Sequence, residues 1–440
     1  MSAVGSELRT SINGTPAVLA ARVPIRRVRV ALLGYGRVGQ ALARLIDAEC
    51  ARLRSDGLDL ALVGALIRDP LKSRSGPSIP LRTSARDLLA RKVDVLIDVM
   101  GGEHPALEIV NGALDAGVHV VTANKTLVAG HGEALSALAR RRGVAFAYDA
   151  AVLAGVPFLG ALARRPLIGA PDRITGIVNG TSHFIVGEIA AGGSLAEALE
   201  EAKARGYAEP DSSADLSGRD AAEKLTILLH LAGCRTVHVS DLTTCSVEAI
   251  GSADVLGARA IGGIIKPAAL ASLHPANPGA WVGPAVFDAA HPFAALSGVQ
   301  NAIEFAGSTG DPVTFAGPGA GPRVTAGTIL DDVAEILAAP APATAAAVRR
   351  EPVPAATLRH PFRSAWFVRS IGSSMSAGDL AAAFSARQLS VPVIVECGRA
   401  WIARTGEARW SAIADVLSLL RARGADALAL PIVPVSPLSR

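Results

Sequence analysis

A glycine-rich turn near the start of the chain combines residue types that can hold a phosphate-bearing ligand. Residues 28–33 form a short apolar run typical of a strand, and a helical pattern follows the turn. Between them lies the spacing G-x-G-x-x-G, made of Gly34, Tyr35, Gly36, Arg37, Val38 and Gly39. The first glycine permits the turn, the second lets backbone approach a pyrophosphate, and the third lets helix and strand pack closely. The helix N-terminus adds N–H donors, so this context predicts a dinucleotide site, although such spacing also occurs in purely structural turns.

The end of the next predicted strand bears on which dinucleotide is bound. This strand covers residues 58–67 and ends at Arg68, with Lys72 and Arg74 close behind. Cations at this place suit the 2′-phosphate of NADP, which is the cofactor we expect. In the alternative, Arg68 is only an exposed strand end and Asp69 holds the ribose, in which case NAD is bound.

A carboxylate and an amine, Asp220 and Lys224, stand four residues apart in a predicted helix over residues 217–232. This spacing places both side chains on one helix face. An ammonium group so placed can protonate an oxygen that gains charge during a reaction. Such a pair is more often a solvated surface ion pair worth a few tenths of a kcal/mol. Here it borders the apolar stripe of its helix and follows a loop rich in Gly, Glu and Asp at residues 206–215, which favours function.

Alternating strands and helices would position these groups. The predicted strands are residues 28–33, 58–67, 93–100, 118–122 and 144–148, with helices at 105–116 and 134–142 among them. This alternation predicts an α/β fold with a parallel, doubly wound sheet of the Rossmann type. We assign residues 27–150 to the dinucleotide-binding domain, completed by a helix at residues 325–338.

The remainder of the chain has a different organisation. Residues 1–26 are predicted to be a disordered extension, and residues 151–324 an α+β domain. Residues 339–357 are rich in Ala and Pro and are predicted to be a linker. Residues 358–440 follow the order βαββαβ of a ferredoxin-like module. Its predicted elements are residues 364–370, 378–387, 391–397, 400–405, 412–423 and 427–432.

The composition excludes several classes of protein. The net charge of +4 is mild for 440 residues, and no aromatic residues interleave with the basic clusters, so we expect no nucleic-acid partner. No apolar run reaches the roughly 18 residues of a membrane span. The four cysteines show neither zinc spacing nor a disulfide framework, which favours a reducing, cytoplasmic setting.

Several motifs together resemble the homoserine dehydrogenase family over residues 28–338. The family patterns G-G-x-x-P-A, V-T-A-N-K, G-I-x-N-G-T, G-Y-A-E, D-x-x-G-x-D-A-A-x-K and G-P-G-A-G are matched in order at Gly101, Val121, Gly176, Gly206, Asp215 and Gly317. The stretch from Asp149 to Pro157 resembles E-A-S-V-x-x-G-I-P. The resemblance implies NAD(P)-dependent interconversion of L-aspartate 4-semialdehyde and L-homoserine, in threonine, methionine and isoleucine biosynthesis. It also implies that residues 151–324 bind substrate and form a homodimer or higher homo-oligomer.

The resemblance implies roles for particular residues. Lys224 would donate the proton, with Asp220 and Lys125 as the other catalytic groups. Glu209, Asp215 and Asp220 would bind the substrate. Cofactor contacts, beyond the glycine turn and Arg68, would be made by Met100, Gly101, Lys125, Gly206 and Gly321. Na⁺ or another monovalent cation would be held by Asp149, Val152, Ala154 and Val156.

This chain departs from the family pattern at a few positions. Asp149 stands where the family has Glu, one methylene longer, and His183-Phe184 stands where Asn-Tyr is common. His183 is interpreted either as a satisfied loop histidine or as a changed site contact. These changes leave two alternatives: a Rossmann dehydrogenase of another small amino or oxo acid, and a non-catalytic amino-acid-sensing paralogue.

The C-terminal module resembles an ACT regulatory domain, which can bind an amino-acid effector such as threonine. The Asp-x-Pro-Gly usual after its first strand is absent, and residues 372–376 (GSSMS) occupy the place. Effector binding and a dimerising or vestigial role therefore both remain open for the module.

Overall fold

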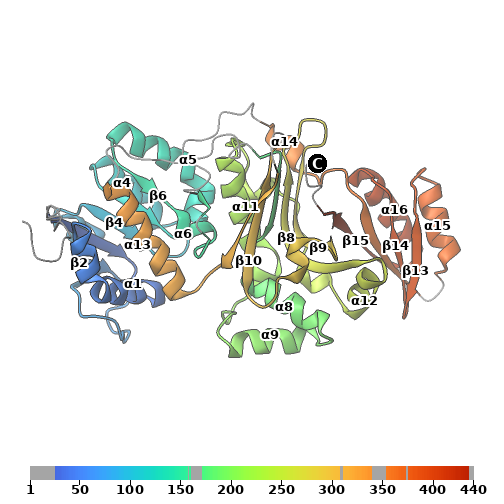
Figure 1. The fold of residues 1–440 in the computed structure, drawn as a ribbon, viewed down its shortest axis with the longest axis horizontal. Coiled ribbons are helices and arrows are strands. Elements are labelled where there is room, and N and C mark those ends of the chain that lie inside the picture. Colours follow the sequence, from blue (N-terminus) through green and yellow to red (C-terminus); the bar gives the residue numbers. More distant parts are fainter. Residues whose placement is uncertain are drawn as a thin grey trace, which may run out of the picture.

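The protein is described by a computed structural model that covers residues 25–156, 158–159, 171–307, 311–338, 353–372 and 375–435. The chain is elongated, with the N-terminal domain, the middle domain and the C-terminal module following one another along the long axis (Figure 1). Most of the predicted extension, residues 1–24, and most of the predicted linker, residues 339–352, lie outside the described residues. Within the described residues, no helix is both long and apolar enough to cross a membrane.

The N-terminal domain is built on a six-stranded sheet in the order β3-β2-β1-β4-β5-β6. Every neighbouring pair is parallel. This is the strand order of a Rossmann dinucleotide-binding fold, and it confirms the predicted fold class. The strands are β1 (Arg26–Leu33), β2 (Leu58–Leu66), β3 (Leu81–Arg82), β4 (Val95–Asp98), β5 (His119–Thr122) and β6 (Phe146–Ala147).

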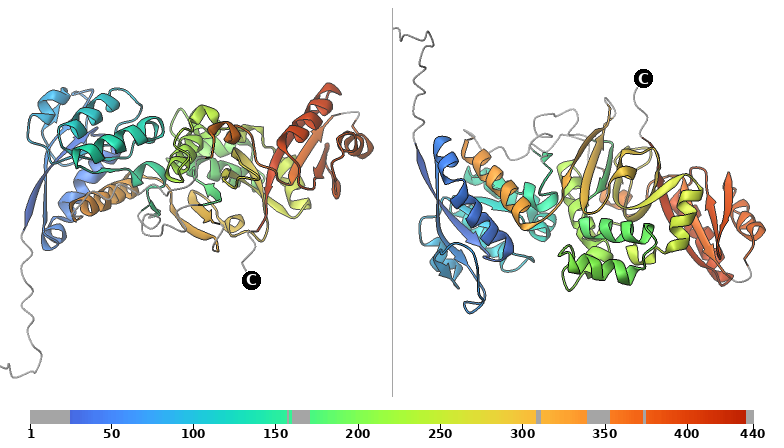
Figure 2. Two further views of the ribbon diagram at one scale, coloured as in Figure 1. Left: turned by 90° about the horizontal axis from the view of Figure 1, so that it is seen from above. Right: turned by 60° about the horizontal axis from the view of Figure 1, so that its bottom comes forward.

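Helices from two distant parts of the sequence cover this sheet. Helix α13 (Pro322–Ala338) returns from the far end of the middle domain and packs beside α1 (Arg37–Ala48), as Figure 2 shows. Both helices share one apolar cluster with β1 and β4. The predicted completing helix is therefore present and begins at Pro322. The other helices are α2 (Cys50–Ser55), α3 (Ala85–Leu89), α4 (Ala106–Asp115), α5 (Lys125–Arg142) and α6 (Asp149–Val152).

The middle domain is an antiparallel sheet with helices on both faces. Its strands follow the order β11-β10-β7-β8-β9, and β11 is a strand that the sequence pattern did not predict. The strands are β7 (Arg173–Ile177), β8 (Gly263–Ser272), β9 (Gly279–Asp288), β10 (Gln300–Ala306) and β11 (Val313–Pro318). The helices are α8 (Gly180–Ala190), α9 (Leu195–Ala204), α10 (Ser213–Leu216), α11 (Arg219–Leu231) and α12 (Ser252–Ala260), with 3₁₀ turns at Val239–Asp241, Val247–Ala249 and Pro292–Ala295.

The C-terminal module has the predicted βαββαβ order. Its elements are β12 (Trp366–Ile371), α15 (Ala377–Ser385), β13 (Val393–Cys397), β14 (Ala400–Arg404), α16 (Trp410–Ala422) and β15 (Asp426–Val433). They form an antiparallel sheet in the order β15-β12-β14-β13. Strand β15 also pairs in parallel with β9, which joins module and middle domain into one nine-stranded sheet. The short helix α14 (Ala355–Leu358) lies at the end of the predicted linker.

A buried ion pair adds to this joint. Arg369 of β12 places Nη1 2.8 Å from Asp254 of α12 and Nη2 2.8 Å from Asp426 of β15. The side chains of Arg369 and Asp254 are 8% and 0% exposed. Burial raises the pKa of Asp254, and the Arg369 guanidinium opposes that rise. The Asp254 carboxylate therefore depends on Arg369, because without this cation it would be a charge left in a poorly hydrated interior.

We expect Arg369→Ala to lower the free energy of unfolding by about 3–5 kcal/mol, because it leaves the Asp254 carboxylate buried without its counter-ion. Denaturant unfolding would measure this change. The matched control is Arg387→Ala, which removes an exposed pair 3.4 Å from Asp415 in the same module. The control is expected to cost less than about 1 kcal/mol, and equal losses in both variants would contradict the assignment.

Candidate active site

The glycine turn lies at the carboxyl end of β1, where open α/β sheets bind their ligands. Gly34 has φ of +102°, a conformation that favours glycine. A Cβ at Gly39 would lie 2.5 Å from the Gly34 carbonyl oxygen, so helix α1 can approach the turn only with glycine there. Gly36 caps the helix N-terminus, and a Cβ there would meet nothing within 4 Å. The open side of the turn is thus available to a pyrophosphate.

The end of β2 presents both candidate ribose partners to solvent. Arg68 is exposed, and Asp69 is exposed beside it. The Asp69 carboxylate accepts from the amide of Leu71, and its carbonyl accepts from Arg74, which also bonds the Lys72 carbonyl. Arg74 therefore shapes this loop, and Arg68 is the exposed cation at the strand end itself.

A cluster of charges forms where the N-terminal and middle domains meet. Lys125, the first residue of α5, places Nζ 2.8 Å from Asp220 Oδ1. Lys224 places Nζ 2.9 Å from Asp220 Oδ2. Asp220 and Lys224 are 6% and 8% exposed. The sequence pattern alone left open a solvated surface pair on α11, and the burial excludes that interpretation.

The polar atoms of the cluster are held by the turn before α8. Lys224 Nζ donates to the Val178 carbonyl at 2.7 Å. The Asn179 amide lies 2.7 Å from Asp215 Oδ1 and 2.8 Å from Asp220 Oδ2. Asn179 also caps α8 by accepting from the amide of Ser182. Its position as a helix N-cap was readable in the sequence, but its contact with the two carboxylates was not.

The electrostatics of the cluster fix its charge state. Burial opposes ionisation of Asp220, but the Lys224 and Lys125 ammonium groups outweigh it and hold the pKa of Asp220 below its usual range. Burial likewise opposes the charge on Lys125, yet Asp220 and the nearby carboxylates raise the pKa of Lys125. Burial raises the pKa of Asp215, and the positive charges of Lys224 and Lys125 offset only part of that rise. Asp220 is therefore held in its ionised form between Lys125 and Lys224.

A further buried carboxylate, which the sequence pattern did not single out, lies beside the cluster. Glu223 is 6% exposed and accepts from the Thr126 hydroxyl at 3.2 Å. Burial raises the pKa of Glu223, and Lys125 opposes that rise. Glu223 lies one turn from Asp220 on α11, so helical spacing was the signal that could have found it.

Glu209 lies apart from this cluster. Its side chain is 74% exposed and its carboxylate lies 3.2 Å from Arg37 of the glycine turn. This contact links the loop before α10 to the cofactor domain. Gly206, in the same loop, has φ of +74° and is also exposed. The predicted substrate acid thus faces the cofactor side of the interdomain region.

The predicted cation ligands lie together on α6 and the turn that follows it. They supply one carboxylate and three backbone carbonyls, all hard oxygen donors of the kind that suit a monovalent cation. The Ala154 carbonyl accepts from the Thr328 hydroxyl, and the Val156 carbonyl accepts from the amide of Phe158 at 2.8 Å. Each carbonyl retains a second lone pair, so the donor set is compatible with a cation. Among the described residues, no group of three or more His, Cys, Asp or Glu side chains could hold a metal.

His183 is a buried histidine on α8. It is 1% exposed, and its Nδ1 lies 2.8 Å from the Gln300 carbonyl oxygen while Nε2 lies 3.4 Å from Lys266 Nζ. Burial and the Lys266 charge lower the pKa of His183 to about 4, so its imidazole is neutral. These partners fit the interpretation of His183 as a satisfied histidine.

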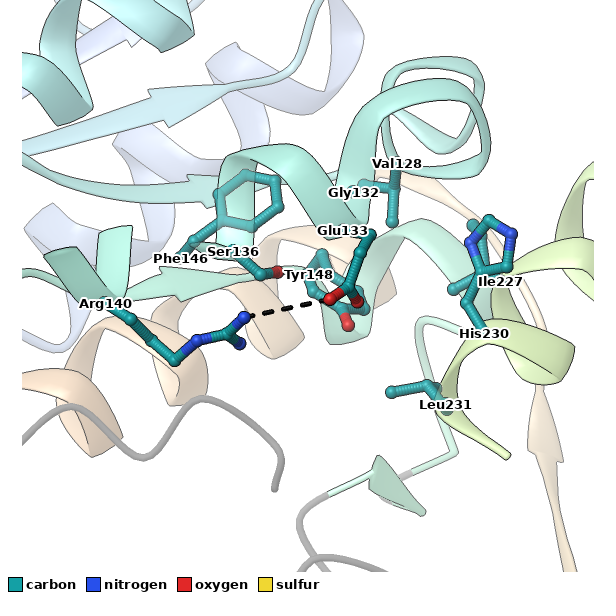
Figure 3. Close-up of a pocket in the computed structure, with 10 residues that line it drawn as sticks. All are labelled: Val128, Gly132, Glu133, Ser136, Arg140, Phe146, Tyr148, Ile227, His230 and Leu231. Atoms are coloured by element: carbon teal, nitrogen blue, oxygen red, sulfur yellow. Dashed lines mark ion pairs between the residues drawn. The ribbon is translucent and has the colours of Figure 1, made fainter. Parts of the chain in front are cut away.

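A small cavity lies elsewhere between the domains (Figure 3). It holds about 30 Å³ and is lined by α5, α11 and Tyr148, with Glu133 and Arg140 paired at its rim. Burial raises the pKa of Tyr148 to about 12. None of the predicted catalytic, substrate or cofactor residues lines this cavity, and it is too small for a dinucleotide.

A Rossmann sheet, an open glycine turn and a buried ammonium–carboxylate cluster at the same strand ends define an NAD(P)-dependent oxidoreductase. Comparison with known proteins agrees. Residues 34–149 match the family described as homoserine dehydrogenase, NAD binding domain, and residues 158–334 match the family described as homoserine dehydrogenase. The chain belongs to the homoserine dehydrogenase family.

Individual relatives support this membership. The chain is 33% identical to the homoserine dehydrogenase of Pseudomonas aeruginosa over 72% of this chain and 73% of the relative. It is 36% identical to that of Corynebacterium glutamicum over 72% and 74%. The crystal structure of a homoserine dehydrogenase from Thiobacillus denitrificans superposes with a TM-score of 0.84 at 26% identity, covering 94% of this chain and all of that one. A hyperthermophilic archaeal homoserine dehydrogenase in complex with NADPH has a TM-score of 0.59 at 26% identity, over 71% of this chain and 98% of that one.

We expect Asp220→Asn to lower the free energy of unfolding by about 3–5 kcal/mol at neutral pH, because Lys125 and Lys224 then converge without their counter-ion. The pKa of Asp220 is depressed in the folded protein, so its contribution is present above its unfolded value of 3.8 and is lost as the pH falls further. The difference from wild type should therefore shrink in acid. Denaturant unfolding at several pH values would measure this.

The control for this prediction is Glu200→Gln, which removes an exposed pair with Lys203 on α9. It should change stability by less than about 1 kcal/mol at any pH. A pH-independent loss in Asp220→Asn would contradict the charge assignment.

Proposed function

We propose that this protein interconverts L-aspartate 4-semialdehyde and L-homoserine, with NADP as the preferred cofactor and NAD as a possible one. The observation that carries the proposal is the buried cluster in which Lys125 from the cofactor domain and Lys224 from the middle domain share Asp220. It puts an acid group at the domain junction, beside the strand ends where the dinucleotide is expected. The NADPH complex of the archaeal relative supports a nicotinamide cofactor.

The proposed chemistry follows from the charge that develops on the substrate. A nicotinamide cofactor held at the glycine turn would supply hydride chemistry to the aldehyde carbon, and negative charge would then develop on the carbonyl oxygen. Lys224 donates a proton to that oxygen, and in the oxidation of homoserine it accepts the proton from the hydroxyl. Lys125 provides a second positive charge that stabilises the oxygen.

The carboxylates orient the cation and the substrate. Asp220 bonds both ammonium groups and so keeps Lys224 aligned, as its two short contacts require. Glu209 and Asp215 receive the substrate α-ammonium. Glu209 must exchange its exposed partner Arg37 for the substrate, which costs little because solvent screens that pair.

The finer assignments rest on the family resemblance. We propose that Asp149, Val152, Ala154 and Val156 hold a monovalent cation that orders the turn after α6. We propose a homo-oligomer on the same basis, and a cytoplasmic enzyme because its four cysteines show neither zinc spacing nor a disulfide framework. The C-terminal module, with the strand order of a ferredoxin-like fold, is proposed as an ACT-like domain, for which amino-acid effector binding and a dimerising or vestigial role are the two alternatives.

The two alternative functions make different demands. A non-catalytic paralogue would have no need of the buried cluster of Asp220, Lys125 and Lys224, which costs solvation energy to keep. A dehydrogenase of another small amino or oxo acid would be favoured by a changed contact at His183, but that side chain is bonded within the protein. A panel of hydroxy acids and aldehydes, followed by nicotinamide absorbance, distinguishes these alternatives from homoserine turnover.

We expect Lys224→Ala and Asp220→Ala each to lower kcat for homoserine oxidation by about 10²–10⁴-fold, because the proton acceptor or the group that aligns it is lost. The measurement is NADPH absorbance under saturating cofactor. Lys203→Ala is the control, since the Lys203 ammonium donates to Glu200 at 3.0 Å on the exposed face of α9. Near-normal turnover in both site variants would rule out the assignment.

Cofactor choice is tested separately. We expect Arg68→Ala to raise KM for NADP by about tenfold and leave KM for NAD unchanged, because only NADP carries the 2′-phosphate that Arg68 would bind. Arg86→Ala, on the exposed helix α3, is the control for general loss of positive charge. If Asp69→Ala instead raises KM for NAD while Arg68→Ala leaves KM for NADP unchanged, NAD is the preferred cofactor, because only NAD carries the free 2′-hydroxyl that the Asp69 carboxylate would bind.

A further inference from the structure

Asp98 is a buried carboxylate that no part of the proposed chemistry uses. It is the last residue of β4 and is 0% exposed. Its Oδ1 accepts from the amide of Met100 at 2.9 Å, and its Oδ2 accepts from the Thr122 hydroxyl at 3.0 Å. Met100 lies in the loop after β4, and Thr122 ends the neighbouring strand β5. The carboxylate thus joins the ends of two adjacent strands.

The chain of hydrogen bonds continues to the start of α5. The Thr122 hydroxyl oxygen accepts from the amide of Asn124 at 3.0 Å. The Asn124 side chain donates to the Gly102 carbonyl at 2.7 Å and accepts from the amide of Leu127 at 3.2 Å, which caps α5. Residues 100–102 and the first turn of α5 are therefore tied together at two places.

Both ends of this chain carry proposed chemistry. Met100 and Gly101 are among the residues expected to contact the cofactor. Lys125, the first residue of α5, holds Asp220 at 2.8 Å. A shift in the hydrogen-bond chain would move the cofactor loop and this lysine relative to each other, and a displacement of about 1 Å can cost a large part of a catalytic rate.

The hydrogen bonds at this position suit an ionised carboxylate. Two donors approach two different oxygen atoms of Asp98, and an ionised carboxylate accepts from both. An asparagine would still accept from the Met100 amide, but it would turn its own amide donor toward the Thr122 hydroxyl, which would then have to accept instead of donate. The ionised group is retained although its burial is costly.

We propose that Asp98 is a positioning residue whose ionised carboxylate holds the loop of residues 100–102 against the N-terminus of α5, and thereby sets Lys125 relative to the nicotinamide. This inference rests on the proposed function, which places cofactor and substrate at these two ends. The groups that face Asp98 are the Met100 amide, the Thr122 hydroxyl and the Asn124 side chain. They are uncharged, and Lys125 is directed to Asp220.

The ionisation of Asp98 makes the proposal measurable. Burial raises the pKa of Asp98 from 3.8 to about 6, with the three hydrogen bonds opposing the rise. Because the pKa of Asp98 is raised in the folded protein, the protonated carboxyl contributes to folding stability. This contribution is lost as the pH increases through about 6. The ionised form that supports positioning is the less stable one, so catalysis and stability should respond to pH in opposite directions.

The experiment compares Asp98→Asn, Thr122→Val and wild type by kcat/KM against pH and by melting temperature. Wild type is expected to lose kcat/KM in acid with a pKa near 6. Asp98→Asn should lack this acid limb, the loss of kcat/KM at low pH. Above about pH 6 its kcat should be about tenfold lower than that of wild type, and its melting temperature should not be lower. Thr122→Val removes a bond that lowers the Asp98 pKa, so the limb should move to higher pH.

The matched control is Asp94→Asn at the other end of the same strand region, where Asp94 bonds Arg29 at 2.6 Å. It should lower the melting temperature and leave kcat and the acid limb as in wild type. An acid limb that neither site variant moves would overturn the proposal, and if Asp98→Asn does not fold, Thr122→Val decides alone. If the wild-type protein does not turn over homoserine at all, the proposed function is wrong instead, so the two failures are distinguishable.

Discussion

The structure depends on one buried carboxylate shared by two ammonium groups. Asp220 loses most of its hydration at the junction of two domains, and that loss is offset mainly because Lys125 and Lys224 both approach within 3 Å. The lysines come from different domains, so the electrostatic requirement of the site is also a requirement on how the domains pack. Any change that separates α5 from α11 leaves a charge in the interior without a partner.

The Rossmann sheet supplies the other half of this arrangement. Parallel strands end at one edge, so the glycine turn after β1, Asp98 at the end of β4 and Lys125 after β5 all lie on the same side of the sheet. Helix α11 brings Asp220 and Lys224 to that edge, and α13 returns to complete the cofactor domain. The site is therefore built from rigid element ends, with loops shaped by short side-chain hydrogen bonds.

The C-terminal module is joined more firmly than a linker alone would suggest. Strand β15 extends the middle sheet through β9, and Arg369 binds Asp254 across the same joint. A buried ion pair and shared strand hydrogen bonds transmit displacement better than a flexible connection does, because neither can be stretched without losing its energy. An effector bound to the module would act on the sheet that underlies α8 and α11.

Local pattern determined much of this protein. The alternation of strands and helices predicted the doubly wound sheet, the glycine spacing predicted the turn at Gly34, and the four-residue spacing placed Asp220 and Lys224 on one helix face, because each depends on neighbours along the chain.

Strand β11, the continuity of β15 with β9, and the contact of Lys125 with Asp220 were decided only by the tertiary structure. The same is true of Asp98, since a buried carboxylate has no periodic signal, and of Glu209, which faces Arg37. Burial and pairing between distant segments are properties of the packed chain, and no local pattern contains them.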